Sequence, residues 1–214
     1  MADEIVFRWV LAIVVLTTVV ILLRFRIKAA SSGERISRRE EGRTLAVALR
    51  GAGFLLWLST LAYLLLPSWV AWAAIPLHPV LRWLGVLAVV VCCGLFYWTL
   101  ASLGKNLTDT VVTRQEAVLV TGGPYRLVRH PFYVVTALLM AAVTLVTANL
   151  LIGASSLLVM TLLVIRTPKE EEKLLHRFGQ SYRDYMARTG RFVPRSSSVP
   201  RSSSRSSSLD HRRR

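Results

Sequence analysis

Long apolar runs are the feature that most constrains how this chain folds. Hydrophobic residues make up 53% of its 214 residues. About 20 helical residues cross the hydrocarbon core of a bilayer, and the runs near or above that length are Ile5 to Leu23, Leu45 to Leu66, Leu81 to Leu103 and Phe132 to Ile165. The last run is long enough for a helical hairpin that turns near Asn149. We therefore predict an all-α integral membrane protein with about five transmembrane helices.

The charges between the runs predict the orientation. The segment from Arg24 to Arg43 carries seven Arg or Lys residues, and 104–131 is also basic, whereas Pro67 to Pro79 has no charged residue. Basic segments stay on the cytoplasmic side of a membrane. We therefore expect the N terminus outside and the C terminus inside. The first run is interpreted as a retained span, because no convincing Ala-x-Ala cleavage site precedes the basic Arg24 to Lys28.

Isolated residues near or within the runs have simple interpretations. Arg8 and Arg50 lie near the ends of spans and are expected to snorkel toward the interface. Gly51, Gly53 and Gly85 could allow close helix contact, either between copies or inside the bundle. The oligomeric state therefore stays open.

Charge and cysteine content narrow the classes of function. The net charge is +15, yet the tail at 195–214 alternates Arg with runs of Ser and offers no aromatic residue to stack on bases. We predict a disordered tail, attracted at most weakly to an anionic leaflet, and no nucleic-acid partner. Cys92 and Cys93 are adjacent in an apolar run, which is neither a disulfide framework nor a metal-ligand spacing. We predict no metal site.

A dense polar block precedes the last run. It reads Gly123-Pro124-Tyr125-Arg126-Leu127-Val128-Arg129-His130-Pro131-Phe132-Tyr133. Its glycine and proline residues predict a tight turn whose backbone approaches a ligand closely. Pro131 suits the start of a helix with His130 at the cap, where free N–H groups and the helix dipole favour a carboxylate or phosphate. The alternative is a capped helix with His130, Tyr125 and Tyr133 in an interfacial aromatic belt.

A second polar block, Arg166-Thr167-Pro168-Lys169-Glu170-Glu171-Glu172, follows the last run. Thr167 to Glu170 has the form of a capping box with proline at the first helical position, which would make Glu170 only a cap. If the helix continues instead, four-residue spacing places Arg166 beside Glu170. The hairpin returns this block to the membrane face of His130. One cation and one anion facing a helix end suit a zwitterionic ligand.

The segment after this block predicts amphipathic helices on the cytoplasmic membrane surface, covering the site. Apolar residues recur there at near-helical spacing, with an interruption at Gly179, and they are Leu174, Leu175, Phe178, Tyr182 and Tyr185.

These motifs resemble the isoprenylcysteine carboxyl methyltransferase family and the related phospholipid methyltransferases. The resemblance covers 104–194 and lies in Leu119-Val120-Thr121-Gly122-Gly123-Pro124-Tyr125, Arg129-His130-Pro131-Phe132-Tyr133, and Arg166 with Glu170-Glu171, Leu174, Phe178-Gly179, Tyr182 and Tyr185. One departure is Ala117, where better-known members often carry His. The resemblance implies an S-adenosylmethionine site on the cytoplasmic side, contacted by Leu119, Val120, Tyr125, His130, Pro131, Phe132, Tyr133 and Glu170, with Arg166 facing the methyl acceptor.

The implied reaction moves a methyl group from an activated sulfonium to a lipid-like acceptor, and it depends mostly on alignment. A prenylcysteine or isoprenoid carboxylate is already ionised and needs no base; we expect Arg166 to orient it and Glu170 to hold the cofactor. A phospholipid amine would have to lose a proton, with His130 or Glu171 as candidate base. Arg166 and Glu171 are thus the candidate catalytic residues.

The predicted organisation has three parts: N-terminal transmembrane helices at 1–103, a methyltransferase-like cofactor-binding region at 104–194, and the tail at 195–214. The expected partners are the bilayer and a lipophilic or prenylated substrate. Two other functions remain open. An NADPH-dependent intramembrane reductase of the sterol type could use a similar helical scaffold, and a non-catalytic scaffold would use the polar blocks only as caps and anchors.

Overall fold

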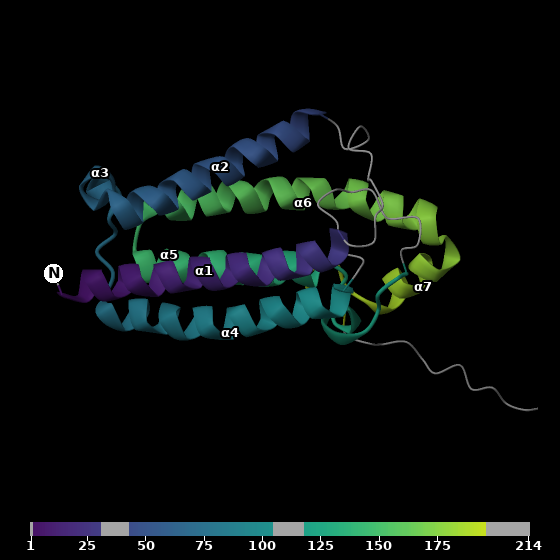
Figure 1. Ribbon diagram of the computed structural model, residues 1–214. Coiled ribbons are helices and arrows are strands. Elements are labelled where there is room, and N and C mark those ends of the chain that lie inside the picture. The colour runs from purple at the N-terminus through teal and green to yellow at the C-terminus, as the bar shows by residue number, and fades with distance from the viewer. Residues whose placement is uncertain (1, 31–42, 105–117, 196–214) are drawn as a thin grey trace, which may run out of the picture.

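The computed structural model describes residues 2–30, 43–104 and 118–195, and this part of the chain is helical without a named strand (Figure 1). The long helices are α1 (Ala2–Ala30), α2 (Arg43–Leu65), α4 (Pro79–Leu103), α5 (Pro131–Thr147) and α6 (Leu150–Phe178). Short elements are α3 (Pro67–Val70), η2 (Ala71–Ala73), η4 (Gly123–Arg126) and α7 (Gln180–Arg188). The predicted tail at 196–214, the loop at 31–42 and Ala117 lie outside the described residues.

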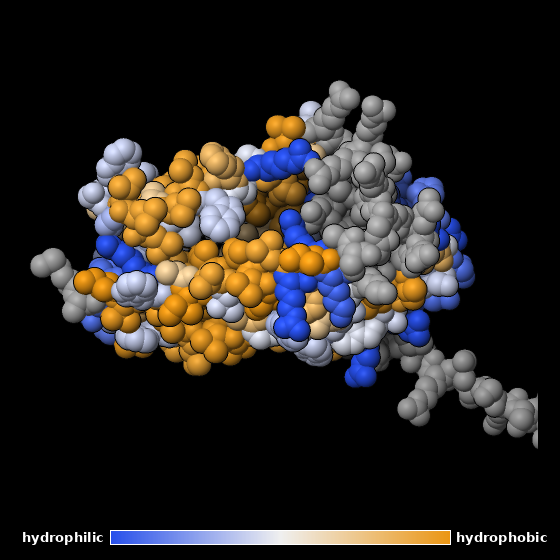
Figure 2. All heavy atoms as spheres, in the orientation of Figure 1, coloured by the Kyte–Doolittle hydropathy of each residue, from blue (hydrophilic) through white to orange (hydrophobic). Residues whose placement is uncertain are grey.

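The all-α membrane fold is confirmed. Four helices, α1, α2, α4 and α6, are long and apolar enough to cross a bilayer, and α5 is a shorter apolar helix of 17 residues. Large apolar side chains on these helices point outward: Trp9, Ile13 and Leu16 of α1 and Leu87 and Val90 of α4 are all exposed. Figure 2 shows this apolar covering along the length of the bundle. Such a surface is stable only when lipid covers it.

The helices pack in pairs. α2 runs along α6, α4 runs along α5, and α1 lies against α4, with the N terminus and α3 at one end of the bundle and α7 at the other (Figure 1). α4 and α5 approach closely at Gly85, where a Cβ atom would lie 2.9 Å from Leu145 Cβ and 3.0 Å from the Val146 nitrogen. Gly85 therefore serves packing within the bundle, whereas Gly51 and Gly53 have nothing within 4 Å.

The predicted hairpin turn is confirmed at Asn149. α5 ends at Thr147 and is followed by Ala148, whose φ of 46° lies in the left-handed region. The Asn149 side-chain oxygen accepts hydrogen bonds from the backbone nitrogens of Leu151 at 3.1 Å and Ile152 at 3.3 Å, which caps α6. Its amide nitrogen donates to the Val70 carbonyl at 3.2 Å. One buried side chain thus fixes the turn and ties it to α3.

The interpretation of Thr167 to Glu170 as a helix start is wrong. α6 runs through Pro168 without interruption to Phe178. The Thr167 hydroxyl donates to the Leu163 carbonyl at 3.0 Å, back along the helix, and does not cap a new one. The predicted break at Gly179 is confirmed, since this residue has a φ of 53° and separates α6 from α7. The two acidic residues Glu170 and Glu171 therefore sit on a rigid extension of the last membrane helix.

An ion pair between a buried arginine and a partly exposed glutamate fastens α1 at the end of the bundle that holds α3. Arg82 of α4, with only 9% of its side chain exposed, forms an ion pair with Glu4 of α1. Its Nε donates to the Val146 carbonyl at 3.0 Å, and its guanidinium carbon lies 3.9 Å from the centre of the Phe7 ring. Arg8, which we expect to snorkel, lies 5.9 Å from the ring centre of Tyr63. Sequence reasoning missed Arg82 and Glu4.

We expect Glu4→Gln to lower the free energy of unfolding of the detergent-solubilised protein by about 2 kcal/mol, and its melting temperature with it. The reason is that Arg82 then keeps a buried charge without its ionic partner. The matched control is Asp3→Asn, an identical change one residue away on an exposed side chain. Equal melting temperatures for the two variants would contradict this role of the ion pair.

Candidate functional site

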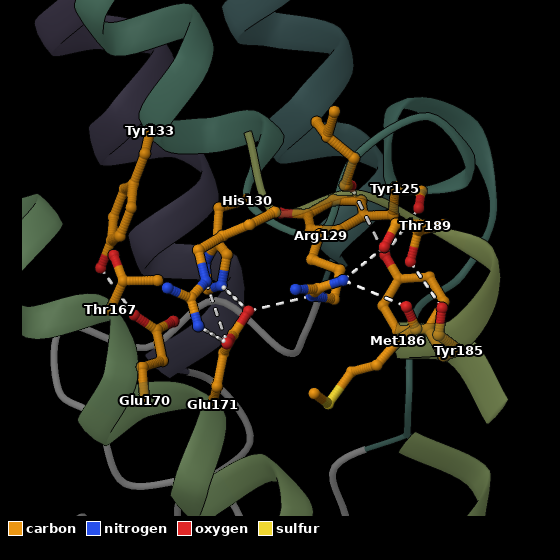
Figure 3. Close-up of polar contacts among 12 residues, drawn as sticks. Tyr125, Arg129, His130, Tyr133, Thr167, Glu170, Glu171, Tyr185, Met186 and Thr189 are labelled. Atoms are coloured by element: carbon orange, nitrogen blue, oxygen red, sulfur yellow. Dashed lines mark hydrogen bonds and ion pairs between the residues drawn. The ribbon is translucent and has the colours of Figure 1, made fainter. Parts of the chain in front are cut away.

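The predicted site residues gather at the end of the bundle that holds α7. The segment before α5, the extension of α6 beyond Ile165 and the residues after α7 meet there (Figure 3). Figure 3 shows His130 and Arg129 directed at Glu171, and Tyr133 directed at Glu170. The hairpin of α5 and α6 therefore brings the two polar blocks together, as predicted.

The turn before α5 is held by α7. Gly123 to Arg126 form the short helix η4, and the Tyr125 side chain is buried. The Tyr185 hydroxyl donates to the Tyr125 carbonyl at 2.6 Å. Burial raises the pKa of Tyr185 to about 12, so that its hydroxyl keeps its proton at neutral pH. Leu119 and Val120 lie half-buried in the extended segment that leads into this turn.

α5 begins as predicted, with His130 at the cap and Pro131 in the first turn. No side chain caps this helix end. The His130 ring is buried and stacks on Tyr133, with ring centres 5.4 Å apart. His130, Tyr125 and Tyr133 are all buried in the protein. These rings therefore do not form the interfacial aromatic belt that was the alternative interpretation of this block. Phe132 instead packs into the bundle against Phe96, 5.6 Å between ring centres.

Glu171 is the centre of the charged network. Its side chain is only 7% exposed. Oε1 accepts from Arg129 Nε at 2.9 Å and lies 3.2 Å from His130 Nε2, while Oε2 accepts from Arg191 Nε at 3.0 Å. A buried carboxylate is stable only when it is paired in this way. Both of its oxygens are therefore occupied by groups of the protein.

Glu170, one residue earlier, is held differently. Its Oε2 accepts a hydrogen bond of 2.6 Å from the Tyr133 hydroxyl, and its side chain is half-buried. Its Oε1 accepts no hydrogen bond from any residue that the structure describes. Arg166 lies one turn earlier on the same uninterrupted helix, half-buried, as the spacing predicted. Among the described residues, one oxygen of Glu170 is therefore left as an acceptor next to the buried ring of Tyr133.

Sequence reasoning missed two members of this network. Arg129 lies inside the first block, but nothing local indicates that it bonds Glu171, 42 residues away. Arg191 follows α7 and reaches Glu171 only because the chain folds back onto the segment before α5. Pairing between distant segments leaves no pattern in a single sequence, which is why these contacts were not predicted.

Comparison with known proteins finds a match to one family model. Residues 83–176 match the sequence model of the isoprenylcysteine carboxyl methyltransferase (ICMT) family. The resemblance predicted from the two polar blocks is thereby confirmed, and both blocks lie within or adjoin the matched residues.

Two curated proteins share similar stretches. One is the nickel-cobalt-cadmium resistance protein NccN of Alcaligenes xylosoxydans xylosoxydans, 29% identical over 109 residues, which are 50% of this chain and 51% of that protein. Another is the cobalt-zinc-cadmium resistance protein CzcN of Cupriavidus metallidurans, 30% identical over 117 residues, which are 53% and 54% of the two chains. The chain spans about half the length of the curated relatives it matches.

One solved structure is similar in part. It is the eukaryotic intramembrane Ras methyltransferase ICMT, with 24% sequence identity and a TM-score of 0.48. The match covers 72% of this chain and 53% of that chain.

Gly123 offers a test of the turn before α5. Its φ of 59° is costly for other residues, and an added Cβ would lie 2.6 Å from the Ser102 hydroxyl. We expect Gly123→Ala to destabilise the protein by about 1–2 kcal/mol in thermal unfolding. Gly122→Ala is the control, because Gly122 has ordinary extended backbone and nothing within 4 Å. A loss of stability in both variants, or in neither, would refute this account of the turn.

Proposed function

On the premise of the ICMT family match over residues 83–176, we propose that this chain is an integral-membrane methyltransferase that uses S-adenosylmethionine. Its favoured acceptor is the carboxylate of a prenylcysteine or isoprenoid-type lipid. The observation that carries the proposal is the position of Glu170 beside Tyr133 and the start of α5, with one carboxylate oxygen that accepts no hydrogen bond from the described residues.

The residues present fit S-adenosylmethionine. The ligand carries hydroxyl and ammonium donors, which suit the free oxygen of Glu170. It also carries a carboxylate, which suits the start of α5, where no side chain caps the helix. Buried aromatic rings of Tyr125 and Tyr133 supply apolar walls. The residues proposed to contact it are Leu119, Val120, Tyr125, His130, Pro131, Phe132, Tyr133 and Glu170.

The protein's task in such a reaction is alignment. When bound, the cofactor supplies a methyl group on a sulfonium that is already an activated leaving group. Arg166 would then orient an ionised acceptor carboxylate through its guanidinium. It lies one turn before Glu170 on the same helix, so acceptor and cofactor would be held from one rigid element.

The amine acceptor fits the geometry less well. Methylation of a phospholipid amine needs a base, and Glu171 was one candidate. Both Glu171 oxygens already accept hydrogen bonds from arginine, and His130 Nε2 lies beside one of them. We therefore propose that Glu171 organises the site and that the carboxylate acceptor, which needs no base, is preferred.

Orientation follows from charge. Arg24, Arg26 and Lys28 lie in the last turns of α1, and a basic segment precedes α5 in the sequence. These charges favour the cytoplasmic side for the end of the bundle that holds α7. We propose that the N terminus lies outside and that the site and C terminus are cytoplasmic.

The names of the two curated relatives refer to metal resistance, so we looked for side chains that could bind a metal ion. Within the residues that the structure describes, no group of three His, Cys, Asp or Glu side chains could hold a metal ion. The proposal for this chain therefore stays with methyl transfer.

Calorimetric titration tests the cofactor. We expect saturable binding of S-adenosylmethionine, no binding of NADPH, and loss of S-adenosylmethionine binding by at least about tenfold in Glu170→Ala, because the variant loses charge-assisted hydrogen bonds. Glu172→Ala is the control, because it also removes one carboxylate from the same helix, but at an exposed position. Binding of NADPH alone would favour a reductase, and a folded protein that binds neither would favour a scaffold.

The role of Arg166 is tested by separating turnover from binding. Arg166→Ala is expected to reduce methyl transfer to a prenylcysteine at least about a hundredfold, since a bidentate contact to the acceptor is lost. Its affinity for S-adenosylmethionine should change little. Lys169→Ala, an exposed cation on the same helix, is the control. Equal losses of binding and turnover in Arg166→Ala would count against this assignment.

A further inference from the structure

The residues after α7 form a strap across the start of α5. We define the C-terminal strap as Thr189 to Phe192. It lies beyond the residues that match the family, 83–176. Gly190 pairs in parallel with Val128, and the strap carbonyls of Gly190 and Arg191 accept from the backbone nitrogens of Arg129 at 2.9 Å and His130 at 3.1 Å. The strap therefore holds the backbone that leads into α5.

The strap has little freedom to move. A Cβ atom at Gly190 would lie 1.8 Å from the Val193 carbonyl oxygen, so the backbone folds tightly against itself there. The Thr189 hydroxyl donates to the Tyr185 carbonyl at 2.6 Å, and Arg129 donates to the Thr189 carbonyl. Phe192 places its ring centre 5.8 Å from that of His130. These contacts fix the strap to α7 and to the site together.

The two oxygens of Glu171 have different partners. Oε2 receives both donors of Arg191, and Oε1 is left to Arg129 and His130. A carboxylate is planar, so two charge-assisted hydrogen bonds that fix one of its oxygens also set the direction of the other. A neutral His130 that donates from Nε2 to Oε1 keeps Nδ1 as its acceptor. Arg191 is thus linked to the ring orientation of His130 through one carboxylate.

We propose that Arg191 is a positioning residue that orients His130 through Glu171, and that the strap thereby completes the ligand site from outside the family-matched region. Arg191 touches no ligand in this account. The effect on S-adenosylmethionine rests on the proposed function, whereas the orientation of His130 does not.

A double-mutant cycle on S-adenosylmethionine affinity tests the link. We expect Arg191→Gln to weaken binding about tenfold and Arg191→Lys to recover only part of it, since Lys retains the charge but lacks the two fixed donors of the guanidinium. In a Glu171→Gln background, Arg191→Gln should have little further effect. The control is Arg188→Gln, the same change at an exposed residue of α7 whose side chain, among the described residues, donates to the Asp184 carbonyl and not to Glu171. Additive losses in the double variant would overturn the proposal.

A second measurement does not depend on the cofactor. The chain has four His residues, so ring nitrogen resonances of His130 can be assigned by NMR with a His130→Asn variant. Without cofactor, Arg191→Gln should shift the His130 ring nitrogens, while Arg188→Gln should not. Unchanged His130 resonances in Arg191→Gln would overturn the proposal. This measurement does not need the Glu171→Gln variant, so it decides the question even if that variant fails to fold. If the wild type binds no S-adenosylmethionine but the shift occurs, the proposed function fails and the strap proposal stands.

Discussion

The buried carboxylate of Glu171 is the interaction on which the site depends. It joins α6 to Arg129 before α5 and to Arg191 after α7, three segments that are far apart in the sequence. Taking this charge out of water is costly unless several donors surround it, so the three segments can only close together. This contact places His130 and the start of α5 near Glu170 and Tyr133, the residues of the proposed ligand site.

The two ends of the bundle use buried charge for different purposes. At the end that holds α3, the pair of Arg82 and Glu4 is surrounded by Phe7, Tyr63 and the last turn of α5, which fastens α1 to its neighbours. At the other end, the network around Glu171 lies next to Glu170, a carboxylate with one oxygen that accepts no hydrogen bond from the described residues. The charges of Arg82 and Glu4, which are paired with each other, thus stabilise the membrane bundle. Glu170, which has fewer hydrogen-bond partners within the protein, is the residue suited to bind a ligand.

Local signals were sufficient to predict much of this structure. Apolar runs indicated the membrane helices, Asn149 the hairpin turn, and Pro131 the helix start at His130, because each depends on neighbouring residues alone. Pro168 misled, since a proline after Thr normally begins a helix, yet α6 continues through it. The partners of Glu171 and Arg82 lie 19 to 78 residues away. Such pairs are set by tertiary packing, which one sequence does not reveal.

The most direct test of the central claim, that this end of the bundle binds the methyl donor, is a structure of the full chain with S-adenosylhomocysteine, the product that remains after methyl transfer. The account predicts the ligand at the start of α5, within hydrogen-bonding distance of Glu170, with Glu171 still held by Arg129 and Arg191. Ligand density at another place, such as the cluster around Arg82, or no density at saturating concentration, would contradict it.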